Sequence, residues 1–219
     1  MRRNWRRAPW YLRYRIGERV WTRGQILITR ATHLHCTVEF EGPLRIGPGF
    51  RLDIPDDGTL IVGAGVDFRH GFKCEIHGSG RVVIGEGTIF TSHCLIQCTT
   101  SVEIGRRCTF GQSALIYDGT HRYEGLDKHW LDQGYDFQPI RIGDEVGVSD
   151  KCTIHADIGK RAMIASHSVV NRPIPAYCVA AGVPARIVRY FGPEDQRPAS
   201  LRPRRRDRAV ETVDEASGA

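Results

Sequence analysis

The sequence predicts an all-β fold, a parallel β-helix built from six-residue repeats, and three observations lead to this prediction. First, bulky aliphatic or aromatic residues recur every six positions, at Ile84, Phe90, Ile96, Ile104, Phe110, Ile116, Ile142, Val148, Ile154, Ile158, Ile164 and Val170. Second, a small residue lies four positions after many of them, at Thr88, Cys94, Thr100, Cys108, Ala114, Cys152, Ala162 and Ser168. Third, glycine often comes directly after the bulky residue, as in Ile84-Gly85. Six is three times the strand period of two, so three hexads of about 18 residues would close one triangular coil.

The first element, residues 1–30, is a basic aromatic segment. It holds nine arginines and one acid, Glu18, which gives +8, so the remainder of the +6 chain sums to −2. It lacks the apolar run of a signal peptide, and a helix is expected from about Trp10 to Trp21. Two interpretations remain open: a basic helix packed on the domain through its aromatic residues, or an amphipathic helix with which residues 1–24 contact an anionic membrane. Charge confined to this segment is weak evidence for nucleic-acid binding, and none is expected.

The coils are expected to fill residues 31–193 as one domain, followed by a disordered tail. Residues 194–219 hold six arginines and six acids among proline, serine and alanine, a composition typical of disorder. The seven cysteines, with no export signal, indicate reduced thiols in a cytoplasmic protein. Those at small positions of the repeat are interpreted as buried hydrophobes, so no metal site is expected.

The repeat is interrupted once, at the stretch LIYDGTHRYEG of residues 115–125. After Ile116 the chain departs from the pattern, and it resumes at Pro139-Ile140-Arg141-Ile142-Gly143, which leaves residues 122–138 as an excursion loop. The loop is rich in aromatic residues, which could stack on a sugar or pack on a neighbouring subunit. The break contains His121, with Asp118 three positions before it. A break made for packing reasons would leave turn residues, so this pair marks the break as a candidate functional site.

The segment from Ile142 to Val188, which ends in Ile-Pro and Ala-Gly-Val-Pro-Ala-Arg, resembles the closing signature of the hexapeptide-repeat acyltransferases. With the looser repeats before it, the likeness covers about residues 31–193. This resemblance implies a left-handed coil and an acetyl-CoA-dependent or other acyl-CoA-dependent enzyme, similar to the sugar O-acetyltransferases. It also implies a homotrimer in which the loop of one subunit helps to wall the site of the next.

By the same resemblance, His121 corresponds to the catalytic base, and Asp118 would orient its ring. The residues implied for acyl-CoA are Asp150 and Ser166 beside the pantetheine arm, and Asn171, Arg172, Arg186 and Arg189 near the phosphates. Arginine suits phosphate because its guanidinium can form paired hydrogen bonds.

Some positions depart from the usual family pattern: Gly147 replaces a tryptophan common beside the cofactor, and Thr91 and Thr99 stand where related sugar enzymes often carry Asn and Asp. The expected function is transfer of an acyl group to a hydroxyl of a saccharide or glycolipid. The alternatives are N-acetylation of an amino sugar, a γ-class carbonic anhydrase on the same coil, and a non-catalytic β-helix. The carbonic anhydrase would need converging zinc-ligating histidines, and the sequence lacks their spacing.

Overall fold

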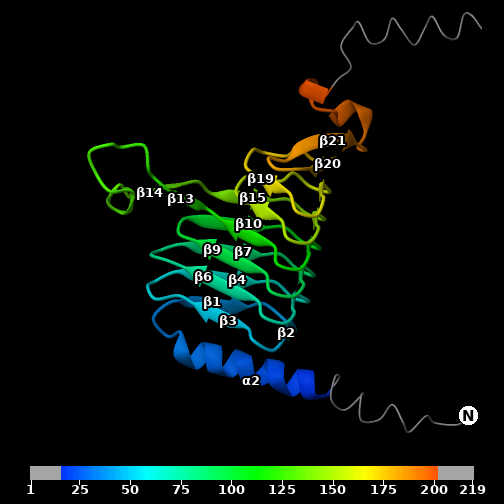
Figure 1. Ribbon diagram of the computed structural model, residues 1–219. Coiled ribbons are helices and arrows are strands. Elements are labelled where there is room, and N and C mark those ends of the chain that lie inside the picture. The colour runs from blue at the N-terminus through cyan, green and yellow to red at the C-terminus, as the bar shows by residue number, and fades with distance from the viewer. Residues whose placement is uncertain (1–15, 202–219) are drawn as a thin grey trace, which may run out of the picture.

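A computed structural model describes residues 16–201, in which the chain winds through three parallel sheets that form the sides of a coil (Figure 1). Sheet A contains β1 (Thr37–Phe40), β4 (Thr59–Val62), β7 (Arg81–Ile84), β10 (Ser101–Ile104) and β15 (Ile140–Ile142). Sheet B contains β2 (Arg45–Ile46), β5 (Asp67–Phe68), β8 (Ile89–Phe90), β11 (Thr109–Phe110), β16 (Gly147–Val148), β18 (Met163–Ile164), β20 (Cys178–Ala181) and β21 (Arg186–Tyr190). Sheet C contains β3 (Arg51–Asp53), β6 (Lys73–Ile76), β9 (Leu95–Cys98), β12 (Leu115–Tyr117), β17 (Thr153–Ile154) and β19 (Val169–Val170).

Each coil runs from sheet A through sheet B to sheet C, and its corners are named here A–B, B–C and C–A. The predicted coil lengths are confirmed: Ile84 pairs with Ile104, a step of 20 residues, and Ile142 bridges to Ile158, a step of 16. The first coils are longer, because Val62 pairs with Ile84, a step of 22. The longer corners explain why the repeat is looser in the early part of the sequence.

The core fills the inside of the coil with the bulky residues of the repeat. All twelve of those named above are buried, and Phe68, Phe90 and Phe110 stack in a column, with ring centroids 5.6 and 4.8 Å apart. The small residues of the repeat are also buried, except Thr100, which is half-buried. Because one continuous core runs through all coils, each coil depends on its neighbours for burial.

The glycine after the bulky residue is explained by the close approach of successive coils. A Cβ on Gly85 would lie 2.6 Å from the backbone of Gly105, and one on Gly105 would lie 2.6 Å from the backbone of Asp144. One position in the turns also requires a positive φ. Gly71 occupies this position in an early coil, and His93 (φ 61°) occupies it one coil later. Later coils thus place side chains at corners where earlier coils place glycine.

The helix α2 (Gly17–Thr32) covers the N-terminal end of the coil stack (Figure 1). The expected helix from Trp10 to Trp21 overlaps it only in part: α2 continues eleven residues past Trp21, and residues 10–15 lie outside the described part of the chain. The helix attaches through Thr22, whose hydroxyl accepts a hydrogen bond from the Ile46 amide (3.0 Å). No helix within residues 16–201 is long and apolar enough to cross a bilayer.

Beyond the last coil, β21 folds back antiparallel on β20, and two short 3₁₀ helices follow, Glu194–Gln196 and Ala199–Leu201. Leu201 packs against the hydrophobic core, so the ordered chain continues past the predicted boundary at residue 193. The remainder of the expected tail, residues 202–219, lies outside the described residues.

Candidate functional site

The interruption of the repeat forms an arm that projects from the C–A corner of the coil (Figure 1). The chain leaves after β12 and forms an antiparallel hairpin of β13 (Gly119–His121) and β14 (Tyr135–Phe137), with a 3₁₀ turn at Trp130–Asp132 between them. It re-enters sheet A at β15, in register with β10. The predicted loop is therefore a two-stranded hairpin, and the excursion begins three residues before His121.

His121 is the last residue of β13 and lies directly across from Tyr135 on β14. The two ring centroids are 4.1 Å apart, and the Trp130 ring meets the imidazole edge-on at 4.9 Å. The Nδ1 atom of His121 is buried and has no hydrogen-bond partner within residues 16–201. A buried polar atom without a partner is costly, so the arrangement favours the arrival of a group from outside this chain segment.

The root of the arm is held by hydrogen bonds between its two ends and the next coil. The Gln138 amide donates to the Asp118 carbonyl (2.8 Å), and the Gln138 side-chain amide donates to the carbonyl of His155 (2.5 Å). The Nδ1 of His155 in turn contacts the Tyr117 carbonyl at 2.9 Å, and its ring stacks on the Tyr117 ring. His155 and Gln138 were missed as site residues from sequence, because the repeat pattern does not show that either residue contacts the root of the arm.

The structure reassigns Asp118, which was predicted to orient the His121 ring. Its side chain is buried, and its carboxylate accepts hydrogen bonds from the backbone amides of Thr99 and Thr100 and from the Thr100 hydroxyl, at 2.6–3.0 Å. The carboxylate thus caps the C–A corner of the preceding coil and does not face the imidazole. The turn-forming alternative for this residue is the one that the contacts support.

Capping of a corner by a carboxylate recurs along the coil. Asp144 accepts from the Arg106 amide (2.7 Å), Asp150 from the Gln112 amide (2.7 Å) and Asp157 from the Arg141 amide (2.8 Å). The hydrogen bond from the Arg106 amide is the main cause that holds the pKa of Asp144 below its ordinary value. Asp150, predicted to lie beside the pantetheine arm, therefore already has a structural task for one of its oxygens.

The six residues predicted for acyl-CoA fall at two different corners of the coil and on its last strand, β21. Asp150 and Ser166 lie in one column at the B–C corner, since the strands before them, β16 and β18, pair in register. Arg186 and Arg189 lie on β21 and pair with Ala181 and Val179 of β20, at the last coil of sheet B. All four side chains belong to exposed or half-buried surface rather than to the core.

Asn171 and Arg172 lie instead at the C–A corner, on the same side as the arm. Asn171 follows β19 just as His155 follows β17 and Tyr117 ends β12, because Ile116, Ile154 and Val170 pair in register. The two corners are separated by the width of sheet C, about five residues of extended chain or roughly 16 Å. Within one subunit, the structure does not bring all six predicted residues together around His121.

The departures from the family pattern have local explanations in part. A Cβ on Gly147 would lie 2.6 Å from the sulfur of Met163, so the Met163 side chain fills the space where many relatives have an indole. The Thr99 amide donates to the Asp118 carboxylate, which makes this position part of the capped corner. The Thr91 hydroxyl is buried without a partner among the described residues, and nothing in the structure explains it.

Metal and thiol chemistry find no support in residues 16–201. No group of three or more histidine, cysteine, aspartate or glutamate side chains is placed to hold a metal ion there. The seven cysteines are free, and all but Cys36 are buried. Burial is the main cause that raises the pKa of Cys94 to about 11 and that of Cys98 to about 12, so both thiols stay protonated at neutral pH.

The fold of these coils is the left-handed parallel β-helix found in the hexapeptide-repeat acetyltransferases, as the resemblance predicted. An acetyltransferase of this kind from Vibrio cholerae, solved with acetyl-coenzyme A, superposes with a TM-score of 0.52 at 21% identity, covering 78% of each chain. A galactoside acetyltransferase solved with coenzyme A superposes with a TM-score of 0.51 at 20% identity, covering 74% of this chain and 68% of its own. At such identities the likeness establishes the fold.

Among relatives by sequence, a probable acetyltransferase of Mycobacterium tuberculosis is 28% identical over 192 residues, which is 83% of this chain. The chain spans only 58% of that relative's length. No protein-family profile matches the chain. The predicted resemblance to hexapeptide-repeat acyltransferases is confirmed by these names and by the fold.

Proposed function

We propose that this protein transfers an acetyl or other acyl group from acyl-CoA to a hydroxyl of a saccharide or glycolipid, with His121 as the general base. The observation that supports this most is the placement of His121 on an arm that leaves an otherwise regular coil. Its ring is framed by Trp130 and Tyr135, and its Nδ1 atom is buried without a partner among residues 16–201. A structural histidine of the coil would be expected to have its ring nitrogens satisfied, as His155 has with its Nδ1.

Acyl transfer from a thioester to a hydroxyl requires one positioned general base from the protein. Acyl-CoA supplies an acyl group activated as a thioester. As the acceptor oxygen bonds to the thioester carbon and the carbon–sulfur bond breaks, His121 takes the hydroxyl proton and returns it to the departing thiolate. Trp130 and Tyr135 give the acceptor an aromatic wall, which suits the apolar face of a sugar ring. Asp118 has no part in this scheme, because its carboxylate is occupied by the coil corner.

The residues at the last coils fit an acyl-CoA ligand in type. Arg172, Arg186 and Arg189 are exposed and form no ion pair with any described carboxylate, so their guanidinium groups are available for phosphates. The family resemblance assigns Ser166 and Asp150 to the pantetheine arm, and both lie on the surface at the B–C corner, where β21 begins with Arg186. We therefore keep all six predicted residues as the proposed binding set.

The proposed assembly is a homotrimer, and the separation of the two corners supports it. His121 and Arg172 lie at the C–A corner, whereas Asp150, Ser166 and Arg186 lie at the B–C corner, at opposite ends of sheet C. If two subunits meet along their flat sides, the B–C corner of one can face the arm of the other. A shared site would also cover the arm's exposed aromatic residues.

The base assignment is tested by following thiol release from acetyl-CoA with a panel of neutral sugars, amino sugars and glycolipids. His121→Ala should lower the rate roughly 10²–10⁴-fold, the range for loss of a positioned general base. The matched control is His129→Ala, because His129 lies on the same arm but contacts the Leu131 amide (3.3 Å) and the Trp130 ring rather than His121. Wild-type rates for His121→Ala would refute the assignment. Turnover with amino sugars alone would replace O-transfer by N-transfer.

The shared site is tested by co-expressing two defective variants, His121→Ala and Arg186→Glu, and assaying at low acetyl-CoA. If each site takes His121 from one subunit and Arg186 from another, some sites in mixed trimers carry neither defect, and activity returns to a measurable fraction of wild type. If each site lies within one chain, every chain carries a defect and no activity returns. Light scattering of the wild-type protein reports the trimer independently.

A further inference from the structure

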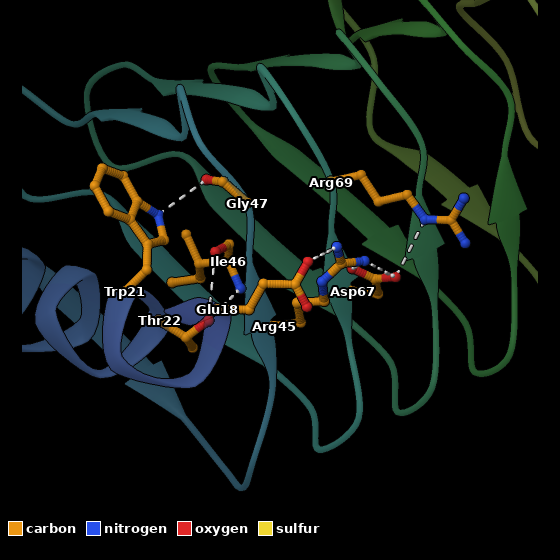
Figure 2. Close-up of polar contacts among 8 residues, drawn as sticks. All are labelled: Glu18, Trp21, Thr22, Arg45, Ile46, Gly47, Asp67 and Arg69. Atoms are coloured by element: carbon orange, nitrogen blue, oxygen red, sulfur yellow. Dashed lines mark hydrogen bonds and ion pairs between the residues drawn. The ribbon is translucent and has the colours of Figure 1, made fainter. Parts of the chain in front are cut away.

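The helix α2 lies on the coil with its polar side inward, the reverse of an ordinary surface helix. Thr22 and Thr29 are its buried residues, and Thr22 both donates to and accepts from the backbone of Ile46 (Figure 2). Glu18 also points inward, to Arg45, at 2.5 Å. The side that faces the coil is therefore attached by hydrogen bonds and an ion pair, with Ile26 packed against the core beside them.

The side of α2 that faces away from the coil is apolar. We define the outer face of α2 as Ile16, Val20, Gly24, Leu27, Ile28 and Ala31, together with Leu34 just beyond the helix. Val20 and Leu27 are each 67% exposed, and Leu34 is 85% exposed. A Cβ added at Gly24 would touch nothing within 4 Å, so the middle of this face is open. Spacings of three and four residues keep the positions within α2 on one side of the helix, and Leu34 follows its last residue by two.

Basic side chains run along one edge of the outer face. At 100° per residue, Arg19, Arg23 and Arg30 fall on the same flank of the helix, and all three are exposed. The only acid of α2, Glu18, is paired inward with Arg45, which also contacts Asp67 (Figure 2). The flank therefore carries positive charge that no carboxylate of the helix offsets. In the sequence, residues 1–15 directly before it add six arginines and four aromatic residues.

The position of α2 allows this face to meet a flat surface. The helix lies across the N-terminal end of the coil stack, with the strands of all coils on its other side (Figure 1). An exposed apolar stripe with a basic edge, on a helix that cannot span a bilayer, has the properties of an interfacial membrane helix. A second copy of the chain would fit less well, because its own outer face brings three more arginines and no free carboxylate.

We propose that the outer face of α2 binds the surface of an anionic lipid bilayer. The helix lies in the plane of the membrane, with Val20, Leu27 and Leu34 inserted at the level of the headgroups. The arginines of its flank contact the lipid phosphates. The coil then stands on the membrane by its N-terminal end. This proposal does not depend on the enzymatic activity, since binding requires neither acyl-CoA nor an acceptor.

The test is sedimentation of the full-length protein with vesicles of phosphatidylcholine alone or mixed with phosphatidylglycerol. Wild type should bind the mixed vesicles, bind more weakly as salt is raised, and bind pure phosphatidylcholine poorly. Replacing Arg19, Arg23 and Arg30 by glutamine should weaken partitioning on the order of 100-fold, from three lost contacts with an anionic surface. The double variant Val20→Glu, Leu27→Glu should weaken it at least about 10-fold, by placing charge in the inserted face.

The matched control is Leu126→Glu, which makes the same change at a fully exposed leucine on the arm and should bind like wild type. Thermal unfolding should be unchanged in all variants, because none of the altered side chains is buried. If the Val20, Leu27 double variant binds anionic vesicles as well as wild type does, the outer face of α2 is not the docking surface. If instead the same variant abolishes self-association of the lipid-free protein, a second copy occupies this face and the proposal is overturned.

Discussion

The coil stack and the arm are both built of β-strands, yet their strands are stabilised in different ways. Inside the stack, a strand such as β7 pairs with a neighbour on each side, and its inward side chains are fully buried. In the arm, β13 and β14 form a separate two-stranded sheet, and Leu126 is 101% exposed. The comparison indicates that the stack supplies stability, whereas the arm presents side chains to groups outside the chain.

The largest expected effect on stability comes from a matched pair of aromatic residues. Phe110→Ala should cost about 3–5 kcal/mol of unfolding free energy, because it empties a fully buried site stacked on Phe90. Tyr135→Ala in the arm should change stability by about 0.5 kcal/mol or less, while lowering activity through its contact with His121. Urea unfolding measures the first quantity and thiol release the second. Equal losses of stability would show that the arm belongs to the same cooperative unit as the coils.

The sequence could predict the coils because their physical requirements repeat. Each inward position needs a side chain of fixed size, and each close approach of backbones, as at Gly85, needs glycine, so the same sequence pattern recurs in many coils. The arm occurs once, so its sequence contains no repeated pattern. Its position and His121 could be read from the break, but the hairpin and the edge-on contact of Trp130 depend on cross-strand pairing without a period.

Asp118 shows where motif reading failed. Its spacing from His121 suggested a partner, but a corner capped by a carboxylate produces the same residue at the same place. A single sequence cannot distinguish an aspartate that orients a histidine from one that caps a corner. The contacts separate them, since Asp118 accepts from two backbone amides of the preceding coil.

The next largest effect on stability is expected for the buried carboxylate of Asp118, in comparison with the exposed carboxylate of Asp136. Asp118→Ala should destabilise the protein by about 2–4 kcal/mol, because the amides of Thr99 and Thr100 lose their acceptor in a buried corner. Asp136→Ala, which removes the exposed arm pair with Arg122, should cost about 0.5 kcal/mol or less. Chemical denaturation of both variants measures the difference. Asp118→Asn should recover part of the loss if capping is the cause, and no recovery would point to a different role.

A smaller effect is expected at the last coil, in binding rather than in folding. Arg186→Ala should weaken acyl-CoA binding about 10-fold, the loss of one charge-assisted contact at an exposed site, with the rate at saturation little changed. Calorimetric titration with coenzyme A measures it. Arg122→Ala is the control, because its guanidinium pairs with Asp136 on the arm and is not among the predicted phosphate contacts. Equal weakening by both variants would mean that general charge, and not the position of Arg186, attracts the ligand.

The smallest expected effect is at the tip of the arm, in Leu126→Ser. The side chain is fully exposed, and the tip around it is closed by the Gln133 side chain, which bonds both the amide and the carbonyl of Gly125 at 2.8 Å. Because the Leu126 side chain is not buried against any described residue, the substitution should alter the free energy of unfolding by less than about 0.5 kcal/mol. The measurement is made by thermal unfolding at two protein concentrations. At low concentration, wild type and Leu126→Ser should have the same unfolding temperature. A loss that appears only at high concentration would show that Leu126 is buried against another subunit, because only an assembled protein would then feel its removal.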